Sequence, residues 1–137
     1  MKNYVVGFMF CKETKQVVLL KKNRPQWQKG QWNGIGGHIE SYEKPIDAMI
    51  REFKEEAGVS WDKWENFLTI QYSDCIVYFF KAFIPKSELP GIQSMTDEEV
   101  LIFNIDNILS WPIIPNLQWI IPLALDEYII KVEGIGK

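Results

Sequence analysis

The segment 45–57 restricts the fold of this chain more than any other, because its sequence predicts an amphipathic helix with one buried face. Its apolar residues recur at spacings of three and four and fall within about 100° of one another on a helical wheel. They are Ile46, Met49, Ile50, Phe53 and Ala57. Pro45 suits the first turn, where the N–H it lacks has no helical partner, and Gly58 is typical of the position after a helix. This stripe must therefore pack against other elements of the fold.

A second face of the same helix carries three carboxylates, at Glu52, Glu55 and Glu56. Their spacing places them together, where they repel one another unless a cation neutralises them. One interpretation is a solvated acidic surface, which is common on exposed helices. The other is a site for a hard cation such as Mg²⁺, which takes oxygen ligands and commonly bridges to phosphates.

The rest of the chain predicts an α/β fold with a mixed sheet and flanking helices. Strands are expected at 4–11, 16–21, 67–72, 75–84 and 100–105, and a second helix at 116–131. Pro122 lies inside that helix and should kink or restart it. The order β-β-α-β-β-β-α places helices against one sheet. The glycine-rich stretch Trp32–Glu40 resembles a turn, and 22–31 and 85–96 are expected to be loops.

Length and composition restrict the function. The 137 residues suit one domain over 1–137, and the 14% aromatic content can fill a core or stack on a nucleobase. A net charge of −3 argues against a broad basic face for duplex nucleic acid, so the expected partner is a small nucleotide. No apolar run reaches the ~18 residues of a membrane span. We therefore expect a cytoplasmic monomer or homodimer in which Cys11 and Cys75 are buried free thiols.

A gapless motif then gives the acidic helix a context. Gly37, Glu43 and the run R-E-F-K-E-E-A-G-V at 51–59 match the pattern G-x5-E-x7-R-E-U-x-E-E-x-G-U, where U is apolar. This is the Nudix box, and the whole chain resembles the Nudix hydrolases. The resemblance implies an α/β/α sandwich and metal-dependent hydrolysis of a diphosphate link.

The resemblance also implies roles for individual residues. Glu52, Glu55 and Glu56 would bind divalent ions, Mg²⁺ or alternatively Mn²⁺, together with the backbone carbonyl of Gly36. Arg51 and Glu43 would form ion pairs that orient these carboxylates. Glu56 is the first choice for the general base.

A further metal-binding glutamate is expected in the acidic turn before the late strand, at Glu98 or Glu99. The sequence leaves open which of Asp97, Glu98 and Glu99 points inward. His38 occupies a variable position of the motif, so we expect it to face solvent or stabilise a loop.

The run W-N-G-I-G-G resembles the MutT-like hydrolases of oxidised purine nucleoside triphosphates. That resemblance implies that Asn33 hydrogen-bonds a base and that Trp27 lines the pocket. Trp111 would stack on the base, but the acidic pair that follows such a tryptophan is Ile113-Ile114 here. Asn116 and Gln118 are the candidate replacements.

The expected reaction converts a nucleoside triphosphate, with oxidised purines of the 8-oxo-dGTP type as candidates, to the monophosphate and diphosphate. Two alternatives remain open. One is hydrolysis of a dinucleoside polyphosphate, ADP-ribose or a nucleotide sugar, and the other is a non-catalytic nucleotide-sensing domain.

Overall fold

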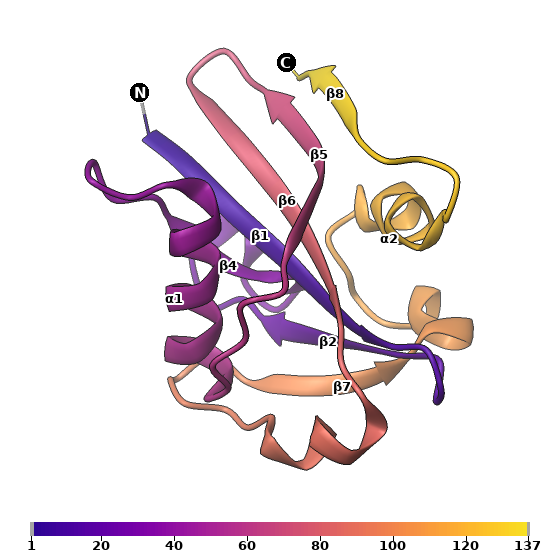
Figure 1. Cartoon of the computed structure of the whole chain (residues 1–137). Helices are drawn as coiled ribbons and strands as arrows, with labels where there is room; N and C mark the ends of the chain where they lie inside the picture. The colour runs from indigo at the N-terminus through magenta and orange to yellow at the C-terminus, as the bar shows by residue number, and fades with distance from the viewer. Residues whose placement is uncertain (1, 137) are drawn as a thin grey trace.

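In the computed structural model, which describes residues 2–136, two helices lie on opposite faces of one sheet (Figure 1). Helix α1 (Pro45–Ala57) has the predicted bounds, and Gly58 ends it in the left-handed region with φ 79°. The predicted stripe faces the core: Met49, Phe53 and Ala57 are fully buried. Helix α2 (Leu117–Leu125) covers the other face, which gives the α/β/α sandwich that the sequence predicts.

The sheet is mixed and contains eight strands within the described residues. The strands are β1 (Lys2–Cys11), β2 (Gln16–Lys21), β3 (Trp32–Asn33), β4 (Ile35–His38), β5 (Glu65–Gln71), β6 (Cys75–Phe83), β7 (Val100–Asn104) and β8 (Val132–Ile135). They run in the order β3-β2-β1-β6-β5-β8, while β4 pairs with β1 and β7 with β2. The β1–β6 and β5–β8 pairs are parallel, and the others are antiparallel.

Strand β1 separates two apolar cores. Val5 and Met9 belong to the core under α1, whereas Phe8 and Phe10 belong to the core under α2. Successive side chains of a strand point to opposite faces, so a strand buried on both sides must be nearly continuously apolar. This accounts for the unbroken apolar run at the start of the sequence.

The glycine-rich stretch is not a turn, because it forms strands β3 and β4. Strand β4 lies against β1, with Val5 opposite Gly37 and Val6 opposite Gly36. A Cβ on Gly36 would lie 1.8 Å from the carbonyl oxygen of Val5. Glycine is therefore required at position 36 by the close approach of two backbones.

The C-terminal region differs from the predicted long helix. Helix α2 ends at Leu125, and residues Val132–Ile135 add strand β8 to the edge of β5. Pro122 lies within α2 without interrupting it. Three short 3₁₀ helices, η1 (Gln26–Gln28), η2 (Lys86–Gly91) and η3 (Ile105–Ser110), occupy connecting segments. None of the helices in residues 2–136 is long and apolar enough to cross a membrane.

Candidate active site

The acidic face of α1 lies against strand β4. Glu56 is buried and the side chain of Glu52 is largely so, while that of Glu55 is 55% exposed. A Cβ on Gly37 would come within 2.7 Å of the Glu52 carboxylate. Gly37 thus leaves the space that Glu52 occupies.

The Arg51 guanidinium contacts four residues around this acidic face of α1. Its Nε and Nη2 donate to the two carboxylate oxygens of Glu43 at 2.7 and 2.8 Å, and Nη1 donates to Glu52 at 2.9 Å. Nη1 also lies 3.4 Å from Glu55, and Nη2 donates to the carbonyl of His38 at 3.0 Å. The hydrogen bond from Arg51 lowers the pKa of Glu43. The guanidinium therefore ties α1 to the preceding loop and to β4, and it fixes the direction of Glu52.

Glu56 is the most perturbed carboxylate of the cluster. Burial, followed by repulsion from Glu52, raises its pKa to about 8, while Lys22 opposes the shift. Burial also raises the pKa of Glu52, although Arg51 counteracts it. The Oε1 atom of Glu56 is buried and accepts no hydrogen bond. A buried, unpartnered carboxylate oxygen is costly, and either a proton or a cation would remove that cost.

The acidic turn before β7 contributes one more buried carboxylate. Glu98 is 5% exposed and accepts a hydrogen bond from the Asn23 backbone N–H at 2.6 Å. Its charge contributes to the raised pKa of Glu56, so the two carboxylates are near neighbours. The side chains of Asp97 and Glu99 are exposed, and Asp97 pairs with Arg24. Of the three acidic residues left open by the sequence, Glu98 is therefore the one whose side chain is buried, while Asp97 and Glu99 are exposed.

Carboxylate oxygens, the groups that this cluster offers, are the ligands that hard divalent cations prefer. Within residues 2–136, no three acidic, histidine or cysteine side chains converge closely enough to hold an ion. Glu52 and Glu55 both pair with Arg51 Nη1, at 2.9 and 3.4 Å. The carboxylates of Glu52, Glu55, Glu56 and Glu98 are the oxygen donors that would hold such an ion.

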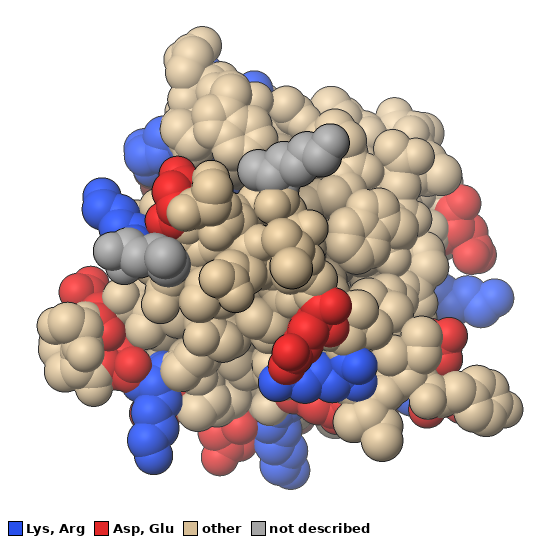
Figure 2. Space-filling view, turned by 90° about the horizontal axis from the view of Figure 1, so that it is seen from above, with Lys and Arg blue, Asp and Glu red and all other residues tan. Residues whose placement is uncertain are grey.

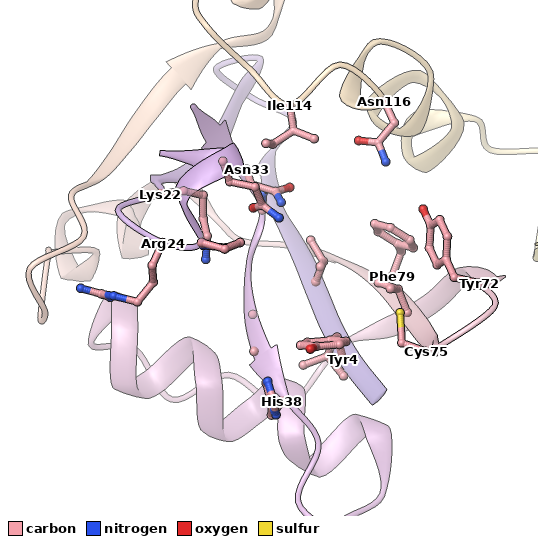
Figure 3. A pocket seen from close by; sticks show the side chains of 18 of the residues that line it. Tyr4, Lys22, Arg24, Asn33, His38, Tyr72, Cys75, Phe79, Ile114 and Asn116 are labelled. Atoms are coloured by element: carbon pink, nitrogen blue, oxygen red, sulfur yellow. The ribbon is translucent and has the colours of Figure 1, made fainter. Parts of the chain in front are cut away.

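A cavity of about 810 Å³ opens over β1, β4 and β6, and its lining includes Tyr4, Val6, Gly36, Val77 and Phe79 (Figure 3). Lys22 and Arg24 line the cavity too, and each lies within 4 Å of Glu98, at 3.9 and 3.8 Å. The carboxylates of the acidic cluster do not line this cavity themselves, so Lys22 and Arg24 are its link to them.

Three of the four predicted base-pocket residues line this cavity: Trp27, Asn33 and Asn116. Asn33 Oδ1 accepts the Gly34 N–H at 2.7 Å, which leaves its Nδ2 group to donate. Asn116 Oδ1 is buried and has no hydrogen-bond partner. Trp27 is 69% exposed at the rim.

Trp111, the fourth, does not line the cavity. Its ring packs edge-on against Phe103 and Trp32, with centroids 5.0 and 6.4 Å away. These contacts belong to the α2-side core, because both neighbours are buried there. The predicted stacking of Trp111 on a base therefore lacks structural support.

Several lining residues were not singled out from the sequence. Lys22 follows the buried strand β2 directly and Arg24 comes two residues later, and this pair of basic residues near a strand end is the only local indication in the sequence. Tyr4 and Tyr72 gave no local sign, because only the pairing of distant strands brings them to one cavity. Cys75 is half-buried and lines the cavity, so of the two predicted buried thiols only Cys11 is fully buried.

His38 ends β4 at the cavity margin. It is exposed, and its ring meets Tyr4 edge-on with centroids 4.5 Å apart. On the face shown in Figure 2, Lys and Arg side chains alternate with acidic ones around an uncharged centre and form no continuous basic patch.

Comparison with known proteins places this geometry in a family. The family model described as NUDIX domain matches residues 1–112. A search of curated proteins found no match.

Solved structures with similar folds include several NUDIX proteins. A MutT structure described for Aliivibrio salmonicida and Vibrio cholerae aligns with a TM-score of 0.75 at 18% identity, covering 90% of this chain and 96% of that one. The NUDIX domain of Shewanella oneidensis NrtR, complexed with ADP ribose, aligns with a TM-score of 0.75 at 17% identity, covering 89% and 84%.

A third similar structure is a bifunctional NMN adenylyltransferase/ADP ribose pyrophosphatase from Francisella tularensis, complexed with AMP and a manganese ion. It aligns with a TM-score of 0.75 at 19% identity, covering 92% of this chain and 41% of that one. At these identities the likeness is one of fold.

Proposed function

This chain belongs to the NUDIX domain family and is a pyrophosphohydrolase, and from that premise we propose that it hydrolyses a nucleoside triphosphate to a monophosphate and diphosphate. The supporting observation is one of position. A buried acidic cluster with an unpartnered carboxylate oxygen at Glu56 adjoins a recess with amide side chains in its walls. The two parts match the two ends of a nucleotide.

The recess suits a nucleobase because it combines aromatic surface with a few polar groups. Tyr4, Tyr72 and Phe79 line it, and flat aromatic ligands stack well on such side chains. Asn33 and Asn116 provide the hydrogen-bonding atoms described above, which is the chemistry that reads a base edge.

The phosphates would lie between the recess and the cluster. Lys22 and Arg24 line that part of the cavity and carry the positive charge that phosphate oxygens require. Both also lie near Glu98, so they can bring substrate and metal ligands together.

NUDIX hydrolases use divalent metals, and we propose Mg²⁺ held by Glu52, Glu55, Glu56 and Glu98. When bound, the metal polarises the diphosphate and offsets charge on the leaving oxygen. Arg51 opposes the effect of burial on the pKa of Glu52 and fixes the direction of its carboxylate. Glu56 is also the proposed general base that accepts the proton from the attacking water, because its carboxylate would lie beside the metal-held phosphates.

A second candidate is hydrolysis of an ADP-ribose-type substrate. Two of the similar structures contain ADP ribose or AMP. The cavity, at about 810 Å³, lies in the upper part of the ~300–1,000 Å³ range of small-molecule sites. That volume leaves room for a group beyond one nucleoside.

Preference for oxidised purines is a separate question within the main proposal. Ile114 is buried and lines the cavity close to where related hydrolases carry an acidic pair. An apolar side chain there does not select a base by hydrogen bonding. We therefore propose a nucleoside triphosphate substrate without restricting it to oxidised bases.

A substrate panel with Mg²⁺ tests these alternatives. It should contain ordinary nucleoside triphosphates, 8-oxo-dGTP, ADP-ribose and a dinucleoside polyphosphate. We expect monophosphate release from a triphosphate, with the Glu56→Gln rate at least about 10²-fold lower. Retained activity in Glu56→Gln would contradict the assigned metal site, and no hydrolysis across the panel would favour a nucleotide sensor.

A further inference from the structure

Tyr72 lines the cavity just beyond the C-terminal end of β5. It follows β5 directly and lines the cavity together with Asn116, the residue before α2. Figure 3 shows the Tyr72 hydroxyl pointing toward the Asn116 side chain across this part of the cavity. The two side chains thus form one wall from segments more than forty residues apart in sequence.

The C-terminal tail holds Tyr72 in place. The Gly136 N–H donates to the carbonyl of Gln71 at 2.7 Å, and Ile135 pairs with the same residue. A Cβ on Gly136 would lie 2.3 and 2.4 Å from the Cδ1 and Cε1 atoms of Tyr72. The tail backbone therefore packs directly on the tyrosine ring, and only glycine permits that approach.

The polar groups of this wall are available to a ligand. Asn116 Oδ1 is buried without a partner, and the side chain does not cap α2. A buried acceptor of this kind opposes folding unless a donor reaches it. The Tyr72 hydroxyl can donate and accept, and burial raises the pKa of Tyr72, so it stays protonated at neutral pH.

This wall combines a residue inside the part of the chain that the family model matches, Tyr72, with two that follow it. Asn116 and Gly136 both come after residue 112, the last one matched. The partner of Tyr72 in the wall and the glycine that packs on it therefore belong to the C-terminal segment.

We propose that Tyr72 is a specificity-determining residue of the nucleotide site and that the C-terminal tail positions it through Gly136. The ligand is a nucleobase whose edge donates an N–H to Asn116 Oδ1 and hydrogen-bonds the Tyr72 hydroxyl. This inference rests on the proposed nucleotide hydrolysis, and its test separates the two.

The test combines steady-state kinetics on the best panel substrate with metal-free calorimetry of its monophosphate product. Tyr72→Phe removes only the hydroxyl, and Gly136→Ala places a methyl group against the ring. Gly134→Ala is the matched control, because a Cβ there has nothing within 4 Å. We expect both test variants to raise KM and the monophosphate Kd about 5–10-fold with kcat within twofold, as for one lost hydrogen bond. Gly134→Ala should match the wild type.

Selectivity gives a second readout that a purely structural role would not move. Wild type should discriminate between the preferred base and an analogue lacking the N–H donor, and Tyr72→Phe should reduce that ratio. If Gly136→Ala lowers the melting temperature markedly, a chain ending at Ile135 replaces it, and KM should rise there as well.

The outcomes are distinct. If the wild type hydrolyses a nucleotide but Tyr72→Phe changes neither KM, Kd nor selectivity, this inference is overturned and the proposed function stands. If the wild type hydrolyses nothing yet binds a monophosphate through Tyr72, the proposed function fails and the wall is supported. If only Tyr72→Phe has an effect, positioning by the tail is overturned.

Discussion

At the scale of single residues, Glu56 places a destabilising buried carboxylate in the candidate site. Its carboxyl group is buried beside Glu52, and its Oε1 atom has no partner. Without a cation, charging this group opposes folding, because both desolvation and repulsion disfavour the anion. A residue that served only the fold would not be placed there.

The raised pKa of Glu56 predicts how stability depends on pH in the absence of metal. From an ordinary value of 4.5 it rises to about 8 in the folded protein. The folded state therefore binds an extra proton between these values. This stabilising contribution is complete below pH 4.5 and is lost as pH rises through 8.

We expect Glu56→Gln, which cannot ionise, to lack this loss. In EDTA, the unfolding free energy of the variant relative to wild type should increase by at least about 1.4 kcal/mol, the worth of one pKa unit, between pH 5 and 8. Urea denaturation at several pH values measures the difference, and the exposed Glu40→Gln serves as control. A pH-independent difference would contradict the assigned pKa.

At the scale of elements, Arg51 joins α1 to the two segments beside it. Arg51→Lys keeps the charge but cannot donate at once to Glu43, Glu52 and the His38 carbonyl. We expect a loss of about 1–3 kcal/mol in stability and a 10–100-fold weaker affinity for Mn²⁺. Chemical denaturation and calorimetric Mn²⁺ titration measure the two effects.

The control for this substitution is Lys54→Arg, an exposed position on the same helix. It should change neither quantity. Weakened metal affinity in the control as well would mean that any exchange of Lys and Arg on α1 has this effect, and the hydrogen bonds of Arg51 would not be its cause.

A buried lysine secures the second helix. Lys81 Nζ donates to the Ala124 carbonyl at 2.9 Å, in the last turn of α2, and its side chain is 8% exposed. We expect Lys81→Met to lower stability by about 1–3 kcal/mol, because a helix carbonyl loses its donor in a buried setting. Thermal and urea denaturation test this.

Lys12→Met is the matched control for Lys81→Met. Lys12 also lies near the C-terminal end of α2, where it pairs with Glu127 at 3.8 Å, but its side chain is 60% exposed. Exposed pairs contribute little, so stability should change by less than about 0.5 kcal/mol. Equal losses in both variants would contradict a special role for the buried lysine.

The elements also show where sequence periodicity is sufficient and where it is not. Helix α1 was predictable to the residue, because its stripe, its proline and its terminal glycine agree with one another. Strands β4 and β8 were not predictable from the sequence, because each depends on pairing with a distant strand. Gly36 packs on Val5, and Val132 pairs with Leu68. Neither contact leaves a periodic pattern of apolar residues in the sequence.

At the scale of the whole molecule, the two halves of the site come from different elements. The carboxylates of Glu52 and Glu56 belong to α1, whereas Tyr72 and Asn116 of the recess follow β5 and precede α2. Strand β4 touches both halves, because Gly37 leaves space for Glu52 and Gly36 lines the recess. In the proposed function, one end of a nucleotide would reach the metal ligands while the other contacts residues from the C-terminal segment.

This arrangement explains which site residues the sequence could indicate. The residues of the Nudix box lie in one helix and the loop before it, so their spacing in the sequence is enough to predict that they lie close together. Tyr72 and Asn116 meet only after β5, the tail and α2 have assembled. The packing of Trp111 against Phe103 also depends on tertiary contacts that the sequence does not indicate.

The separation of the two halves leads to a final prediction about the free protein. In EDTA at pH 8, Glu56→Gln should bind the nucleoside monophosphate as tightly as wild type or more tightly, because it removes a negative charge from the phosphate end. Asn33→Ala and Asn116→Ala should weaken the same binding about 10-fold, as expected for lost base contacts. Calorimetric titration gives all four dissociation constants under one set of conditions. Weaker binding by Glu56→Gln would mean that the carboxylate cluster helps to hold the base. The assignment of the base end and the phosphate end to two separate parts of the site would then be wrong.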